Sequence, residues 1–148
     1  MQVVILDTDW LIIADNWIGQ LQAEQHQVFC VRNASELKSA VQRGLTPQIV
    51  FADPALESSN LAQKWVSFVG EMKEICQQCP FIIMTVGPME AIHDEVLEAL
   101  VRREILVLHK PICATDILDC IQAMQRGWTY ERMVSKLSNI LRPQPPTS

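Results

Sequence analysis

The sequence predicts a doubly wound α/β domain, in which helices cover both faces of a parallel five-stranded sheet. Five short apolar runs recur along the chain, and segments with helical spacing of apolar residues separate them. Each run is nearly continuous in apolar residues, which is typical of a strand buried on both faces. Because parallel neighbours need crossover connections, the intervening helices must lie over the sheet, and the strand order that we predict is 2-1-3-4-5.

The first strand covers residues 3–6 and is followed by the acidic residues Asp7 and Asp9. A helix runs from Trp10 to about Glu24, and Asp9 is placed to cap its first turn. This helix carries an aromatic stripe that includes Trp17. The stripe could form a partner surface, but a widened core-facing stripe is the interpretation that we favour.

The second strand, residues 28–31, is short and is expected at an edge of the sheet. Asn33 starts the next helix, which ends at Gly44, a residue type common just after helix C-termini. The third strand lies between Pro47 and Pro54 and ends at Asp53. Functional groups of open α/β sheets collect beyond the carboxyl ends of the strands, so Asp53 is the leading candidate for a functional residue.

The second half of the chain repeats this alternation. Its expected elements are a helix over 61–75, a strand over 80–87 that includes Thr85, a helix over 89–101, a strand over 105–108 and a helix from Ala114 or Thr115. Lys110 and Pro111 follow the fifth strand. Four of the five strands thus carry, at the carboxyl end or just beyond it, a polar residue that could serve a common site.

We assign residues 1–126 to this domain, 127–142 to a C-terminal helical extension and 143–148 to a disordered tail. The apolar stripe changes phase after Gly127, which indicates a kink or a sixth helix. The apolar face of this extension must cover the domain itself or pair with another chain. Self-docking and a homodimer through the C-terminal helix both remain open.

Composition and charge exclude several classes of protein. The 148 residues suffice for one domain with a proper core, and no apolar run approaches the roughly 20 residues that span a bilayer. The first residues lack the pattern of a signal peptide, so we expect a cytoplasmic location. A net charge of −5 with scattered basic residues argues against direct binding of nucleic acid.

The five cysteines are an odd set, which favours free thiols over a disulfide framework. Cys76 and Cys79 have the CxxC spacing of redox and zinc sites. They end a helix, however, whereas a thioredoxin-like pair opens one, and two thiols make only half of a structural zinc site. We therefore interpret the pair as small structural residues at a helix end.

The strand ends together predict a phosphate-handling site. Asp7, Asp53, Thr85 and Lys110 follow or end four different strands, and Asp9 is a further candidate beside Asp7. Clustered carboxylates repel unless a cation neutralises them, and their oxygens suit Mg²⁺. Asp53 could then act as a nucleophile that forms an aspartyl phosphate, while Mg²⁺, a lysine ammonium and a threonine hydroxyl stabilise the phosphoryl oxygens. A third class, a flavodoxin-like binder or redox protein, is disfavoured, because no phosphate-binding glycine-rich loop follows the first strand.

The order of these landmarks resembles the receiver domain of bacterial response regulators, over roughly residues 3–125. The resemblance implies a flavodoxin-like fold, with Asp53 as phosphoacceptor and Asp7 in a Mg²⁺ site. It also implies Thr85 as switch hydroxyl and Lys110 as phosphate-binding amine, before a cis peptide at Pro111. The phosphodonor would be a histidine kinase or a phosphotransfer protein, and the domain would signal through protein contacts rather than act as an enzyme.

Several positions depart from the family pattern. Thr8 replaces the second acid of the usual pair, which weakens the expected metal site unless Asp9 compensates. Val86 crowds the approach to the phosphoacceptor, and Val107 replaces the aromatic residue that would respond to Thr85. These departures motivate an alternative function, a phosphorylation-independent pseudo-receiver that acts as a dimerisation or docking module.

Overall fold

The structure is a computed structural model that describes residues 1–8, 10–53, 61–77, 79–85, 100, 102, 104–110, 112–137 and 140. The expected helix over 89–101 lies almost entirely outside the described residues, as do Asp9, Val86, Pro111 and the tail over 143–148. Among the described residues, no helix has the length and apolar character needed to cross a bilayer.

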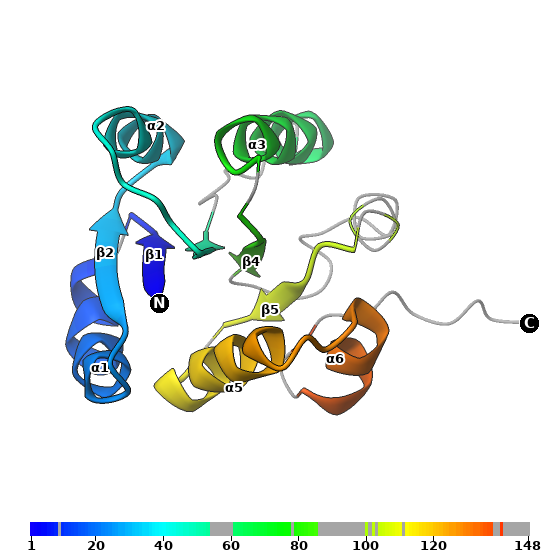
Figure 1. The fold of residues 1–148 in the computed structure, drawn as a ribbon. Coiled ribbons are helices and arrows are strands. Elements are labelled where there is room, and N and C mark those ends of the chain that lie inside the picture. The colour runs from blue at the N-terminus through cyan, green and yellow to red at the C-terminus, as the bar shows by residue number, and fades with distance from the viewer. Residues whose placement is uncertain are drawn as a thin grey trace, which may run out of the picture.

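The strands form one parallel sheet in the order β2-β1-β3-β4-β5, which confirms the predicted topology. Their bounds are β1 (Gln2–Leu6), β2 (Gln27–Val31), β3 (Ile49–Ala52), β4 (Phe81–Thr85) and β5 (Val107–His109) (Figure 1). In the central pair, Leu6 of β1 lies opposite Ala52 of β3. The carboxyl ends of β1 and β3 therefore lie side by side, at the position where the winding of the sheet reverses.

The described helices cover both faces of the sheet. Their bounds are α1 (Trp10–Ala23), α2 (Ala34–Gln42), α3 (Leu61–Ile75), α5 (Ala114–Gln125) and α6 (Tyr130–Lys136). Figure 1 shows α2 and α3 over one face, and α1, α5 and α6 over the other. The helix starts follow local signals: the Asn33 side chain accepts the Glu36 N–H at 2.9 Å and so caps α2.

Each strand contributes to two cores, because successive side chains point to opposite faces of the sheet. One core, beneath α2 and α3, includes Leu37, Trp65 and Met72. The other, beneath α1, α5 and α6, includes Trp17 and Ile117. Trp17 is only 3% exposed, so this member of the aromatic stripe of α1 faces the core, as favoured from the sequence.

The fifth strand begins later than the predicted 105–108, since β5 spans Val107–His109. Ile105 donates its N–H to the Leu100 carbonyl at 3.0 Å, and Glu104 before it has a left-handed φ of +57°. These two features close the preceding segment in the manner of a helix C-terminus. The backbone N–H of Ile105 is therefore bonded to Leu100 and does not take part in the sheet.

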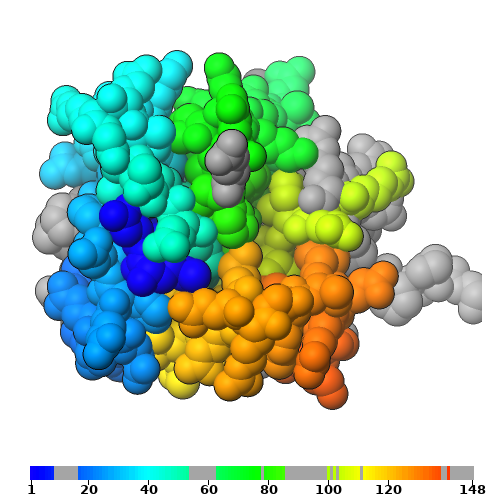
Figure 2. All heavy atoms as spheres, viewed as in Figure 1, coloured from blue at the N-terminus to red at the C-terminus, as the bar shows by residue number. Residues whose placement is uncertain are grey.

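The C-terminal extension contains a separate helix, α6, and packs against the domain. Thr129 caps α6 by accepting the Arg132 N–H at 3.2 Å, and Met133 is 4% exposed within the core that α5 covers. Ile140 forms an antiparallel bridge with Leu108 on the edge strand β5. Figure 2 shows α6 directly beside α5 on this face. The described residues of the extension thus cover the chain's own sheet edge, and association through α6 stays a prediction.

Candidate functional site

Three charged residues, Asp7, Asp53 and Lys110, lie together because each directly follows the last residue of a strand, β1, β3 and β5 respectively. The backbone N–H of Asp7 donates to Val31 of β2 at 3.0 Å, and that of Asp53 donates to Leu6 of β1 at 2.8 Å. The N–H of Lys110 donates to the Thr85 carbonyl of β4 at 2.9 Å. The hydrogen-bond ladder therefore extends one step past the strands and fixes the backbone from which each charged side chain projects.

Lys110 joins the two acids directly. Its Nζ lies 2.5 Å from Asp7 Oδ2 and 2.6 Å from Asp53 Oδ2. Asp7 is 1% exposed and Asp53 is 8% exposed, so the contact is nearly dry. Two carboxylates held this close to each other repel, and the shared ammonium offsets that repulsion.

The environment keeps Lys110 protonated. Burial alone opposes the charged amine, but the hydrogen bonds and attraction from Asp53 and Asp7 outweigh it and raise the pKa of Lys110 above its ordinary value. The ammonium is accordingly a fixed positive charge at neutral pH. Such a charge, placed beside a carboxylate nucleophile, is suited to stabilising a transferred anionic group.

The remaining predicted site residues are placed as follows. Thr85 ends β4, is half-buried and lies in register with His109, one residue before Lys110. Asp9 lies outside the described residues. Thr8 directly follows Asp7 and is exposed, whereas Val107 is 1% exposed within the core beneath α3. Val107 is therefore a core residue and not a surface residue that could move with Thr85.

Trp17 is a supporting residue that the sequence did not assign to the site. Its indole Nε1 donates to the Ile112 carbonyl at 3.0 Å, which ties α1 to the loop just after Lys110. Residues 17 and 112 are far apart in the chain, and only the packing of α1 beside α5 brings them together. The aromatic stripe was the available signal, but it indicates burial and does not identify the acceptor.

A hollow of about 340 Å³ gives access to Asp53. It lies between the ends of β1 and β3 and the start of α2, and its lining includes Thr8, Arg32, Asn33 and Glu71 besides Asp53. The volume suits a group of phosphate size with its water shell. Asp53 can thus be reached from outside although little of its surface is exposed.

The described residues at this site offer few ligands for Mg²⁺. Asp7 and Asp53 supply hard oxygen ligands, and Mg²⁺ is commonly held by one or two carboxylates with several waters. Within the part of the chain that the structure describes, no group of three His, Cys, Asp or Glu residues could hold a metal ion. Both Asp7 and Asp53 also contact Lys110, so a cation has to share its carboxylates with an ammonium.

Comparison with solved structures places this fold among response regulator receivers. The non-phosphorylated receiver domain of the stress response regulator RcsB from Escherichia coli has a TM-score of 0.68 and 19% identity, with 87% of this chain and 95% of that chain covered. A two-component response regulator from Clostridium difficile has a TM-score of 0.62 and 14% identity, covering 85% and 96%. RcsB from Salmonella enterica serovar Typhimurium, bound to a promoter, has a TM-score of 0.64 and 17% identity, covering 93% and 66%.

These likenesses establish the receiver fold. No protein-family model matches the sequence, and a search of curated proteins finds no match. The chain matches nearly the whole of two of these structures and about two thirds of the promoter-bound chain.

Proposed function

We propose that this chain is a receiver module of two-component signalling that accepts a phosphoryl group on Asp53. The observation that carries the proposal is the contact of one ammonium, Lys110, with both Asp7 and Asp53 at the end of the sheet. A structural ion pair needs one acid, whereas a phosphoryl site needs an acceptor carboxylate, a second acid and a fixed cation. The receiver fold of the solved neighbours supports the same function.

In the proposed step, an Asp53 carboxylate oxygen attacks the phosphorus of a phosphohistidine on a histidine kinase or phosphotransfer protein. The new P–O bond forms as the P–N bond breaks, and the imidazole leaves with the electron pair of that bond. The product is an aspartyl phosphate. Lys110 neutralises the negative oxygens of the transferred group, and the Thr85 hydroxyl donates a hydrogen bond to one of them.

Asp7 and Asp53, with Asp9 as a further candidate, would hold the Mg²⁺ ion. When bound, this ion would neutralise further charge on the phosphoryl oxygens. Because Lys110 already satisfies both carboxylates, we expect weaker Mg²⁺ binding than a site with a second adjacent acid would give. Asp7 positions the cations at the site. The domain passes the signal on through protein contacts and does not bind nucleic acid directly.

The test is adduct formation. The protein is incubated with Mg²⁺ and acetyl phosphate, and intact mass is followed for the wild type, Asp53→Asn and the matched control Asp119→Asn, which alters an exposed carboxylate on α5. We expect one phosphoryl group on the wild type and on Asp119→Asn, and none on Asp53→Asn. An unmodified wild type at saturating acetyl phosphate and Mg²⁺ would rule the phosphoacceptor role out.

A second function, the pseudo-receiver, is favoured by one specific observation. The Lys110 ammonium already occupies the space between the two acids, and Thr8 supplies no second carboxylate beside Asp7. The domain would then keep a fixed, charge-balanced surface and act as a docking or dimerisation module. This function predicts no adduct, no Mg²⁺ dependence of stability and an unchanged partner interaction in Asp53→Asn.

A further inference from the structure

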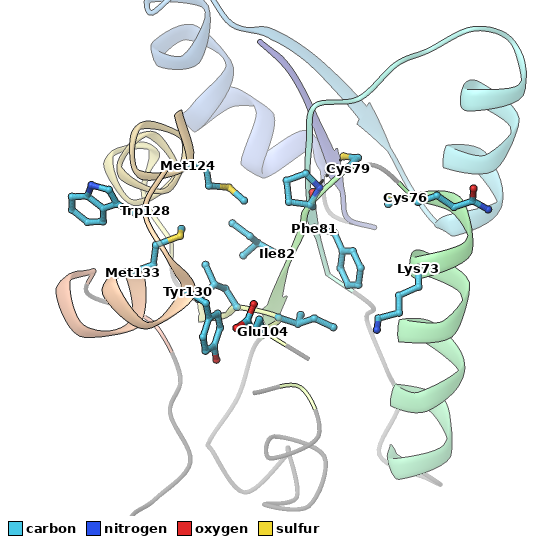
Figure 3. A pocket seen from close by; sticks show the side chains of 14 residues that line it. Lys73, Cys76, Cys79, Phe81, Ile82, Glu104, Met124, Trp128, Tyr130 and Met133 are labelled. Carbon is cyan, nitrogen blue, oxygen red and sulfur yellow. Dashed lines mark hydrogen bonds between the residues drawn. The ribbon is translucent and has the colours of Figure 1, made fainter. Parts of the chain in front are cut away.

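Cys76 and Cys79 lie at the amino end of the sheet, the end opposite to Asp53. Cys76 directly follows α3, and its N–H donates to the Met72 carbonyl at 2.8 Å. The chain then turns toward β4, and the Cys79 N–H points to the Cys76 carbonyl at 3.5 Å. Figure 3 shows both cysteines where α3 ends, on one side of a cavity.

The turn brings the two cysteines close together. Cα atoms three residues apart across a β-turn lie within about 7 Å, and disulfides join Cα atoms about 4.4–6.8 Å apart. Both thiols are free, and the Cys79 thiol donates to the Pro80 carbonyl at 3.4 Å. The pair is therefore held at a separation from which a disulfide can form with little movement of the backbone.

The two thiols affect each other's pKa. The adjacent Cys79 thiol lowers the pKa of Cys76, although burial opposes this effect. The adjacent Cys76 thiol, with burial, raises the pKa of Cys79. The negative end of α3 does not favour a thiolate, so the neighbouring thiol is the feature that does. Beside the turn that joins the two residues, these directions favour Cys76 as the thiol that reacts first and Cys79 as the resolving thiol.

Both cysteines can be reached by a small molecule. They border a cavity of about 620 Å³ between α3 and α6, and also a second cavity of about 560 Å³ beside the β3 entry. Figure 3 shows the first cavity, with Trp128 and Met133 on the far side from Cys76. Cys120 offers a contrast, because it is 1% exposed, lines neither cavity, and burial raises its pKa to about 12.

We propose that Cys76 and Cys79 form an oxidisable dithiol, which a hydroperoxide converts to a disulfide. The Cys76 sulfur attacks one peroxide oxygen, the O–O bond breaks, and the departing hydroxide takes up the Cys76 proton, leaving a sulfenic acid. The Cys79 sulfur then attacks the Cys76 sulfur, the S–O bond breaks, and the hydroxide leaves as water with the Cys79 proton. Two thiols and one hydrogen peroxide give one disulfide and two waters.

The proposed dithiol differs from the structural interpretation drawn from the sequence, and it is independent of phosphoryl transfer at Asp53. In the sequence, the place of the pair at the end of a helix rather than at its start disfavoured a redox role. The structure adds a turn that holds the two cysteines together beside two cavities. Closure of the disulfide would tie the end of α3 to the chain that enters β4.

The test uses the full chain, reduced, freed of reductant and treated with hydrogen peroxide below the total thiol concentration. Remaining thiols are alkylated, and intact mass and peptide mapping follow. We expect a species that carries three labels instead of five and, apart from the labels, is two hydrogen atoms lighter than the reduced chain, with a peptide linking Cys76 to Cys79 and label on the other cysteines. The control Cys113→Ser removes an exposed thiol and should leave the linked peptide unchanged.

The variant Cys79→Ser separates the two chemical steps. It should give no linked peptide and instead a sulfenic acid on Cys76 that a dimedone probe traps, while Cys76→Ser should give neither product. Preferential oxidation of Cys113 in the wild type, with Cys76 and Cys79 both still alkylated, would overturn the proposal. So would equal trapping at Cys76 in the wild type and in Cys79→Ser, since the resolving step would then be absent.

Discussion

At the carboxyl end of the sheet, one ammonium joins two nearly buried carboxylates across strands. At the amino end, thiol, thioether and aromatic side chains border a cavity between α3 and α6. The difference has a simple origin, since the charged residues follow the carboxyl ends of strands, whereas the cavity is bordered by the end of α3, the start of β4 and the extension. Charge balance governs one end and packing governs the other, so changes at the two ends should act separately.

The largest effect is expected from Lys110→Met, which removes the ammonium but keeps most of the aliphatic volume. Asp7 and Asp53 would then face each other without that cation, at 1% and 8% exposure. Removing one partner of a buried ionic cluster is strongly destabilising, and we expect a loss of about 3 kcal/mol in the free energy of unfolding. Urea unfolding at pH 7 measures it. Lys38→Met, on the exposed face of α2, is the control and should change stability by less than about 0.5 kcal/mol.

The pH dependence of the stability difference between the wild type and Lys110→Met tests whether the lost ammonium charge causes it. The pKa of Lys110 is raised in the folded protein above its ordinary value of 10.5, because attraction from Asp53 and Asp7 outweighs burial. The ammonium's contribution is therefore fully present below about pH 10.5 and is lost as the pH rises through the folded-state pKa. The gap between wild type and Lys110→Met should narrow in that range. A gap that stays constant up to the alkaline limit of folding would assign the effect to packing.

At the amino end, Met133→Ala tests whether α6 is part of the core. Met133 is 4% exposed and borders the cavity, so its truncation removes buried contacts and enlarges an existing space. We expect a loss of about 2 kcal/mol in the free energy of unfolding, near the lower limit for methionine truncation in a core. Val66→Ala, at a position that is 65% exposed, is the control and should have little effect.

A result for Met133→Ala equal to that of Val66→Ala would mean that α6 does not cover the sheet in solution. The molecular mass of the wild type in solution would then test the other alternative, in which α6 pairs with a second chain and the protein is a dimer. In either case the carboxyl end should be unaffected. The extent of Asp53 modification by acetyl phosphate should therefore be the same in Met133→Ala and in the wild type.

The carboxyl end was largely predictable from the sequence, because its features are local. An apolar run followed by Asp7, Asp53 or Lys110 fixes which end of each strand carries the charge, and a parallel sheet brings those ends to one edge. The single contact shared by all three side chains was not predictable, since it depends on rotamers and burial. The hydrogen bond of Trp17 to Ile112 was also not predictable, because no local pattern specifies an acceptor so distant in the chain.

The amino end was less predictable, because its features depend on tertiary packing. The apolar stripe after Gly127 indicated that a face must be buried, and it gave no reason to choose the domain's own sheet edge. The bridge between Ile140 and Leu108 supplies that reason, since it covers an edge strand that would otherwise offer free backbone groups. The approach of Cys79 to Cys76 likewise depends on a turn that CxxC spacing alone does not define.

The smallest effect concerns the turn that leads into α6. Gly127 follows the C-cap Arg126 of α5 with a φ of +72°, and a Cβ added there would meet nothing within 4 Å. Any effect of Gly127→Ala is therefore backbone strain, and we expect a loss of about 1 kcal/mol in the free energy of unfolding. Gly70→Ala is the matched control, because Gly70 is exposed within α3 and its Cβ would also meet open space.

The same chemical change should act in opposite directions at these two glycines. Gly70→Ala should stabilise the protein by about 0.5–1 kcal/mol, because alanine favours a helix interior over glycine. Gly127→Ala should destabilise it and should alter the fluorescence of the neighbouring Trp128, which reports on the docking of α6. If both substitutions stabilise, the turn after α5 is not held in the left-handed conformation in solution. The position of α6 at the amino end would then rest on Met133 and its neighbours alone.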